Sequence, residues 1–117
     1  VTPVVAHPER NLVFARNPER LAELVARGAL AQVTAGSLLG DFGKGPMAAC
    51  EEFLRRGLVH LVASDAHSLD LRPPRLSAAR DRVRRDWGRE AEERLFEANP
   101  EALLKSRPIP RSEGWEA

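Results

Sequence analysis

Residues 58–63 read LVHLVA, a near-continuous apolar run that is followed at once by the polar residues 64–68, SDAHS. Strands of a parallel sheet are covered on both faces, so their sequences are apolar throughout instead of alternating. The run therefore predicts a buried strand over 58–63 and a polar loop over 64–68. In parallel α/β folds, functional groups lie in the loops that follow the carboxyl ends of strands.

The sequence upstream of this strand predicts the same alternation twice more. Residues 3–6 (PVVA) and 29–34 (ALAQVT) are short apolar runs with β-branched members, as in buried strands. Asn17 and Pro18 form the cap-proline start of a helix, and Gly57 is a stop signal. We therefore expect strands over 3–6, 29–34 and 58–63, helices over 18–27 and 46–56, and a glycine-punctuated loop with one helical turn over 35–46. This alternation is typical of an α/β protein with a parallel sheet.

The last third of the chain is expected to be helical and then irregular. Helices are predicted over 76–87 and 89–98, and a short helix is expected to begin at a cap on Asn99 and to end near Lys105. Three strands are too few to close a barrel and would leave buried-type edges exposed. We therefore expect residues 1–108 to be one incomplete domain, followed over 109–117 by a proline-rich polar tail that is loosely ordered.

Composition excludes several classes of protein. The chain has 117 residues, of which 43% are hydrophobic and 30% are charged, and its formal charge is +1. No apolar run is long enough for a transmembrane helix or a secretory signal, and the balanced charge offers no attraction for nucleic acid. The single cysteine, Cys50, cannot form an internal disulfide. We expect a cytoplasmic protein that neither inserts into membranes nor binds nucleic acid.

Two of the expected loops carry residue types that bind metal ions. His7-Pro8-Glu9-Arg10 follows the first strand, and Asp65 and His67 follow the third. Residues two apart in an extended segment point to the same side, so Asp65 and His67 can converge on one point. One carboxylate and two imidazoles suit manganese, iron or zinc. The guanidinium group of an arginine such as Arg10 can donate two hydrogen bonds to a phosphate. A hydrogen-bonded surface histidine is the competing interpretation.

Other candidates for chemistry have simpler interpretations. His60 lies inside a predicted strand and Cys50 on an apolar helix face, so both are expected to be core residues. Acids alternate with the arginines over 80–94 at helical spacing, which indicates a solvated helix face. Ser37 and Ser64 lack the G-x-S-x-G context of a serine nucleophile.

Five stretches together resemble one group, the bacterial PHP-superfamily tyrosine-protein phosphatases of the capsular and exopolysaccharide type. The resemblance covers about residues 1 to 108, with the stretches in the same order. Each stretch is short, and it is their combination that is specific. The stretches are 4–11 (VVAHPERN), 32–43 (QVTAGSLLGDFG), 58–67 (LVHLVASDAH), 72–74 (RPP) and 98–100 (ANP).

The resemblance implies a fold, a cofactor and residue roles. The fold would be the C-terminal part of a distorted (β/α)7 PHP barrel, whose strand ends hold a cluster of up to three divalent ions, Mn²⁺ or else Fe, Zn or Mg. His7, Asp65 and His67 match the metal ligands of that carboxyl-terminal half. Arg10 matches the catalytic, phosphate-binding arginine, and Arg72 is expected to bind substrate with it. The family's amino-terminal ligands, an H-x-H pair, an aspartate, a further histidine and a bridging glutamate, have no counterpart in this sequence.

The resemblance also implies a function. It is the metal-dependent hydrolysis of phosphotyrosine in proteins, with a bacterial tyrosine kinase of exopolysaccharide or capsule synthesis as substrate and partner. The chain lacks the amino-terminal ligands, so we expect it to act as part of a longer enzyme. Two alternatives remain: another PHP phosphoesterase, such as a histidinol-phosphatase-like enzyme, and a non-catalytic remnant that serves as an interaction module.

Overall fold

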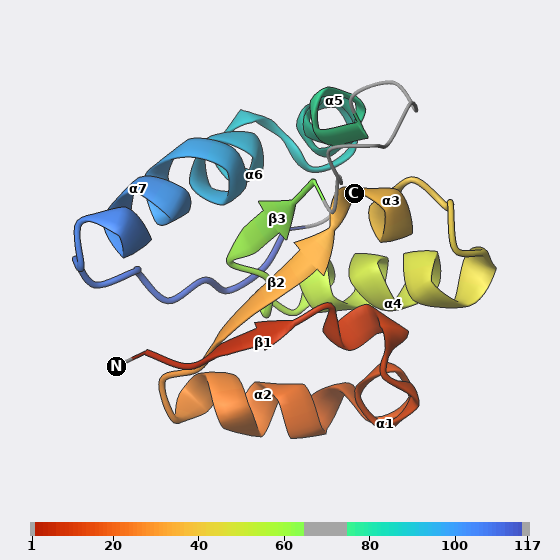
Figure 1. The fold of residues 1–117 in the computed structure, drawn as a ribbon, viewed down its shortest axis with the longest axis horizontal. Coiled ribbons are helices and arrows are strands. Elements are labelled where there is room, and N and C mark those ends of the chain that lie inside the picture. Colours follow the sequence, from red (N-terminus) through yellow and green to blue (C-terminus); the bar gives the residue numbers. More distant parts are fainter. Residues whose placement is uncertain (1, 65–74, 116–117) are drawn as a thin grey trace.

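The computed structural model describes residues 2–64 and 75–115, and the strands in this part form one parallel sheet in the order β1-β2-β3 (Figure 1). β1 is Val4–Ala6, β2 is Leu30–Thr34 and β3 is Leu61–Ala63. Ala6 lies opposite Gln32, and Thr34 lies opposite Ala63. The predicted α/β class with a parallel sheet is confirmed.

Helices connect the strands and cover the sheet. Figure 1 shows α2 on the β1 side of the sheet and α6 and α7 on the β3 side. The helices between the strands are η1 (Pro8–Arg10), α1 (Leu12–Arg16), α2 (Pro18–Ala26), α3 (Ala35–Leu38) and α4 (Lys44–Arg55). Those after β3 are α5 (Arg75–Trp87), α6 (Arg89–Glu93), the π-helical η2 (Arg94–Ala98) and α7 (Asn99–Leu104). No helix in the described part is long and apolar enough to cross a membrane.

Local sequence signals account for most of these boundaries. α2 begins at Pro18 as predicted, because proline suits the first helical turn, where no N–H partner is available. α1 was not predicted; Asn11 caps it by accepting hydrogen bonds from the backbone N–H groups of Val13 (2.9 Å) and Phe14 (3.3 Å). α4 begins two residues earlier than expected, at Lys44, because Pro46 still lies in the first turn.

The predicted short helix is confirmed as α7, which begins at Asn99, but Asn99 does not cap it. Ala98 and Asn99 both have helical backbone angles (φ −65 and −68°, ψ −48 and −44°), so η2 continues directly into α7. The Asn99 side chain is buried and donates a hydrogen bond to the carbonyl oxygen of His60 (2.9 Å) instead of capping a helix. A buried carbonyl needs a donor, and this tertiary need outweighs the local preference of asparagine for a cap.

The hydrophobic core lies between the sheet and the helices that pack on it, and α2 contributes Leu21. The largest fully buried side chains include Phe53 and Leu54 of α4, Val33 of β2, Val83 of α5 and Leu95 of η2. β3 is three residues shorter than predicted, although residues 58–60 are buried. Residues 58–61 are therefore the buried part of the predicted run, whereas residues 61–63 form the hydrogen-bonded ladder.

The predicted loose tail is docked over residues 112–115. Gly57 (φ +74°) ends the turn after α4, and a Cβ on it would lie 2.5 Å from the carbonyl oxygen of Ser112. Gly114 (φ +95°) packs still more closely against the backbone of Arg55. The backbone N–H of Trp115 donates to the carbonyl oxygen of Leu54 (3.2 Å). Two glycines therefore let two backbones meet where any side chain would separate them.

Candidate functional site

The carboxyl ends of the three strands meet at one edge of the sheet, and His7 lies there. It follows β1 directly, and its backbone N–H donates to the carbonyl oxygen of Gln32 on β2 (2.8 Å). Its backbone is left-handed (φ 35°, ψ 57°), a conformation that is uncommon outside glycine. The imidazole is exposed and makes no hydrogen bond within the described part of the chain. Its nitrogens are therefore available to a ligand.

Glu9 anchors the turn that carries His7. It is only 2% exposed, and its Oε2 accepts hydrogen bonds from the backbone N–H (3.1 Å) and the hydroxyl (3.2 Å) of Thr34 at the end of β2. The Thr34 hydroxyl oxygen in turn caps α3 by accepting from the backbone N–H of Ser37 (3.3 Å). Glu9 therefore ties the turn after β1 to the turn after β2. Sequence reasoning missed this role, because residues 25 positions apart carry no local signal of their contact.

Arg10 lies between two hollows next to this turn. The His7 hollow, about 420 Å³, is lined by residues that include His7, Arg10 and Phe14. The Phe42 hollow, about 500 Å³, is lined by residues that include Arg10, Leu12 and Phe42. The guanidinium carbon of Arg10 lies 4.5 Å from the centre of the Phe42 ring, within cation–π range. The structure thus brings His7 and Arg10 together, as the sequence led us to expect, and adds Phe42 to the site.

The other predicted site residues, Asp65, His67 and Arg72, lie outside the described residues. The described end of β3 reaches the same edge as His7, because Ala63 lies opposite Thr34. Within residues 2–64 and 75–115 no three His, Cys, Asp or Glu side chains gather to hold a metal ion. The described part of the chain can therefore supply one ligand to a metal centre. This ligand is the exposed imidazole of His7, which suits manganese, iron or zinc.

Cys50 is a core residue, as predicted. The thiol is buried in α4, and this burial raises its pKa far above the usual range. A thiol is nucleophilic only as the thiolate, so Cys50 is not available for a cysteine-based phosphatase mechanism.

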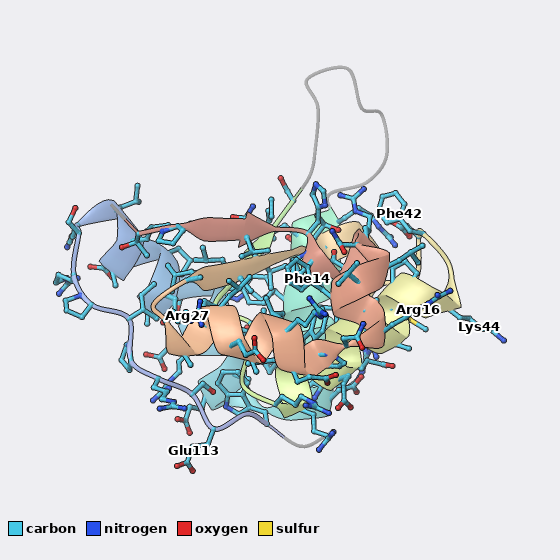
Figure 2. The ribbon with its side chains drawn as sticks, turned by 90° about the horizontal axis from the view of Figure 1, so that it is seen from below. Phe14, Arg16, Arg27, Phe42, Lys44 and Glu113 are labelled. Carbon is cyan, nitrogen blue, oxygen red and sulfur yellow. The ribbon has the colours of Figure 1, made fainter. Side chains whose placement is uncertain are left out.

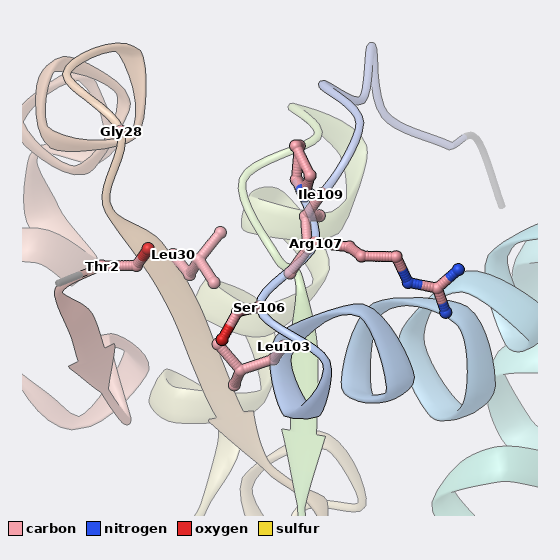
Figure 3. Close-up of a pocket in the computed structure, with 8 residues that line it drawn as sticks. Thr2, Gly28, Leu30, Leu103, Ser106, Arg107 and Ile109 are labelled. Carbon is pink, nitrogen blue, oxygen red and sulfur yellow. The ribbon is translucent and has the colours of Figure 1, made fainter.

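A third hollow lies at the opposite end of the strands (Figure 3). It measures about 530 Å³ and is lined by residues that include Thr2, Leu30 and Ile109. Leu30 begins β2, whereas His7 follows the end of β1, so this hollow is remote from the candidate site. Figure 3 shows the Arg107 side chain directed away from the hollow.

His60 is buried and predicts a pH dependence of stability. Its Nδ1 accepts a hydrogen bond from the backbone N–H of Ala31 (3.0 Å), and burial lowers its pKa. The unfolded chain takes up this proton near pH 6.5 and the folded chain only at lower pH. Above pH 6.5, His60 should therefore not lower the free energy of unfolding. Below pH 6.5, the free energy of unfolding should fall as the pH drops, by at most about 1.4 kcal/mol per pH unit.

Urea denaturation between pH 5 and pH 8 measures this effect. His60→Gln removes the titrating group and keeps an acceptor oxygen, so its stability should depend less on pH than that of the parent chain. His7→Gln removes an exposed imidazole and serves as the control. Equal slopes for the parent and His60→Gln would contradict the assignment.

Comparisons with known proteins find relatives of this chain. The tyrosine-protein phosphatase YwqE of Bacillus subtilis is 41% identical over 107 residues, which are 92% of this chain and 42% of that protein. The tyrosine-protein phosphatase CpsB of Streptococcus agalactiae serotype V is 38% identical over 114 residues, covering 93% of this chain and 47% of that protein. This chain therefore spans somewhat less than half the length of these curated relatives.

A solved structure is also similar. It comes from crystal structures of YwqE from Bacillus subtilis and CpsB from Streptococcus pneumoniae, described as unique metal-dependent tyrosine phosphatases. The match has a TM-score of 0.86 and 38% identity, and it covers 99% of this chain and 47% of that chain. Residues 1–105 match the family described as "Capsular polysaccharide synthesis, CpsB/CapC". Because this match extends over nearly the whole chain, the chain belongs to the CpsB/CapC family.

Proposed function

We propose that this chain is the carboxyl-terminal part of a distorted (β/α)7 PHP barrel and contributes to a cytoplasmic, metal-dependent protein-tyrosine phosphatase. The observation that carries the proposal is that His7 and Arg10 line the same hollow at the carboxyl edge of the sheet. The relatives named tyrosine-protein phosphatases support the reaction, and the family description supports a role in capsule synthesis. The substrate would be a phosphotyrosine protein, such as a bacterial tyrosine kinase of that system.

The proposed metal ligands of this chain are His7, Asp65 and His67. Imidazole nitrogen and carboxylate oxygen together suit Mn²⁺, with Fe, Zn or Mg as the alternatives. Bound divalent ions would neutralise phosphate oxygens and activate a water molecule for attack on phosphorus. The chain supplies three of the ligands of a cluster of up to three ions, so residues of the longer protein would complete it.

Arg10 would act on the phosphate directly. Its planar guanidinium can donate two parallel hydrogen bonds to two phosphate oxygens, with Arg72 as a second cation. Negative charge on the phosphoryl oxygens must be stabilised while the bond to the tyrosine oxygen breaks and water attacks. The products are tyrosine and inorganic phosphate, and Cys50 takes no part.

The experiment compares metal content and activity in two proteins. One is this chain alone, and the other joins this chain to the part of YwqE that it does not match. We expect the joined protein to hydrolyse a phosphotyrosine peptide with Mn²⁺ and to lose at least about 100-fold in rate on His7→Ala, Asp65→Ala or His67→Ala. Each of these changes deletes a ligand, which costs at least as much as deleting the hydrogen-bond partner of a ligand. Cys50→Ala is the control and should keep the activity.

The outcomes separate the alternatives. Activity of the ligand variants close to that of the parent would show that the site is misassigned. A preference for histidinol phosphate over the phosphotyrosine peptide would favour the histidinol-phosphatase-like alternative. Fewer than one tightly bound ion per joined protein, without hydrolysis, would favour the non-catalytic interaction module.

A further inference from the structure

The Phe42 hollow has an apolar wall that the fold leaves open. Phe42 is 41% exposed and Leu12 is 69% exposed, and both line the hollow together with Pro46. These side chains come from α1, from the segment that leads into α4 and from the first turn of α4, so separate elements form the wall. A volume of about 500 Å³ lies in the usual range for small-ligand sites.

Arg10 connects this hollow to the proposed catalytic edge. It lines both hollows, and its guanidinium lies against the Phe42 ring at 4.5 Å. A phosphate that Arg10 holds on the His7 side would therefore have apolar surface on the other side of the same side chain. An aryl phosphate has this shape, with a charged group at one end and a flat apolar ring at the other.

The rim of the Phe42 hollow is positively charged. Arg16 lines it, and Lys44 precedes the lining residue Gly45; neither cation forms an ion pair with a described residue. Figure 2 shows Phe42, Arg16 and Lys44 at the same end of the molecule. The nearby carboxylate of Asp41 is engaged by Arg75 at 2.9 Å, and Glu9 is held by Thr34. The rim thus complements phosphate and acidic side chains.

We propose that the Phe42 hollow is the subsite for the aromatic ring of a phosphotyrosine, with Arg16 and Lys44 favouring acidic residues beside it. The proposal rests on the proposed function and deepens it, because it names residues that select the substrate. A phosphoserine places its phosphate on Arg10 and leaves the apolar wall uncovered. Phosphotyrosine covers Phe42 and Leu12, and contacts between aromatic rings stabilise the complex beyond the area that they bury.

The test measures binding by this chain in the presence of Mn²⁺. Three fluorescent acidic peptides of one sequence, with phosphotyrosine, phosphoserine or unmodified tyrosine, are titrated by fluorescence anisotropy. We expect the phosphotyrosine peptide to bind about tenfold more tightly than the phosphoserine peptide. Phe42→Ala should remove this preference and leave the affinity for the phosphoserine peptide within about twofold of the parent. Equal affinities of the parent chain for the two phosphopeptides would overturn the proposal.

Control variants separate ring binding from folding and from charge. Leu12→Ala, at a still more exposed position, should reduce the preference in part, whereas Leu104→Ala, an 87% exposed leucine outside the hollow, should not change it. Arg16→Gln with Lys44→Gln should weaken binding of both phosphopeptides and reduce its dependence on salt. A dimer in sedimentation that Phe42→Ala dissociates would assign the hollow to a second copy and overturn the proposal.

Hydrolysis by the joined protein keeps the two proposals distinguishable. If it does not hydrolyse the peptide but this chain shows the binding preference, the proposed function fails and the subsite stands. If it hydrolyses the phosphotyrosine peptide and Phe42→Ala leaves KM and kcat unchanged, the subsite fails and the proposed function stands.

Discussion

Arg10→Ala is expected to lower kcat for phosphotyrosine hydrolysis by the joined protein by about 10²–10³-fold, with the metal content unchanged. The side chain lines the His7 hollow but is not among the proposed metal ligands. Its charge matters most when the phosphoryl group carries its largest negative charge, so the loss should fall on kcat more than on KM. Steady-state kinetics and metal analysis of the same preparation measure both quantities.

Arg10→Lys is the matched control for this change. Lysine keeps the positive charge and loses the fork that binds two oxygens at once, so it should recover only part of the lost rate. A loss of metal in Arg10→Ala would show that Arg10 supports the metal centre instead of the phosphate. Full activity of Arg10→Ala would remove it from the site.

Phe53→Ala is expected to lower the free energy of unfolding by about 3–5 kcal/mol. Phe53 is fully buried in α4 and belongs to the core cluster that joins the helices to the sheet. Truncation removes the transfer free energy of the ring and leaves a cavity that close-packed neighbours fill only in part. The free energy of unfolding of a whole domain is about 5–15 kcal/mol, so the variant should be close to unfolding.

Urea denaturation followed by circular dichroism measures the loss. Phe42→Ala is the matched control, because the same ring is deleted at a position that is 41% exposed, and it should cost less than about 1 kcal/mol. Phe53→Leu keeps most of the volume and should cost less than about 1.5 kcal/mol, which keeps the comparison measurable if Phe53→Ala does not fold. Similar losses for Phe53→Ala and Phe42→Ala would contradict the assigned core.

Elements with a strong local signal were predicted closely. The apolar runs 29–34 and 58–63 lie in or beside strands, and Pro18 begins a helix at the expected residue. Because parallel strands end at one edge, the sequence order of His7 and Arg10 after the first strand was enough to place them at that edge. Asp65, His67 and Arg72 stay predictions, as they lie outside the described residues.

Contacts between distant residues could not be predicted from local patterns. Glu9 and Thr34 are 25 positions apart, His60 and Ala31 are 29 apart, and nothing in either neighbourhood signals the other. The stacking of Arg10 on Phe42 likewise depends on how the segment before α4 returns to the turn after β1. Each of these contacts depends on where packing places a backbone in space.

The sequence by itself determined the strand–helix alternation, the parallel sheet and the edge at which His7 and Arg10 lie. These features follow from periodicity, capping residues and strand order, which act over a few neighbouring positions. Only the tertiary structure decided that Glu9 is buried and hydrogen-bonded to Thr34, and that the Asn99 side chain donates to a carbonyl oxygen instead of capping a helix. It also decided that the ring of Phe42 lies against the guanidinium of Arg10. The reason is that buried polar groups must find partners, and close packing alone determines which distant groups come within reach.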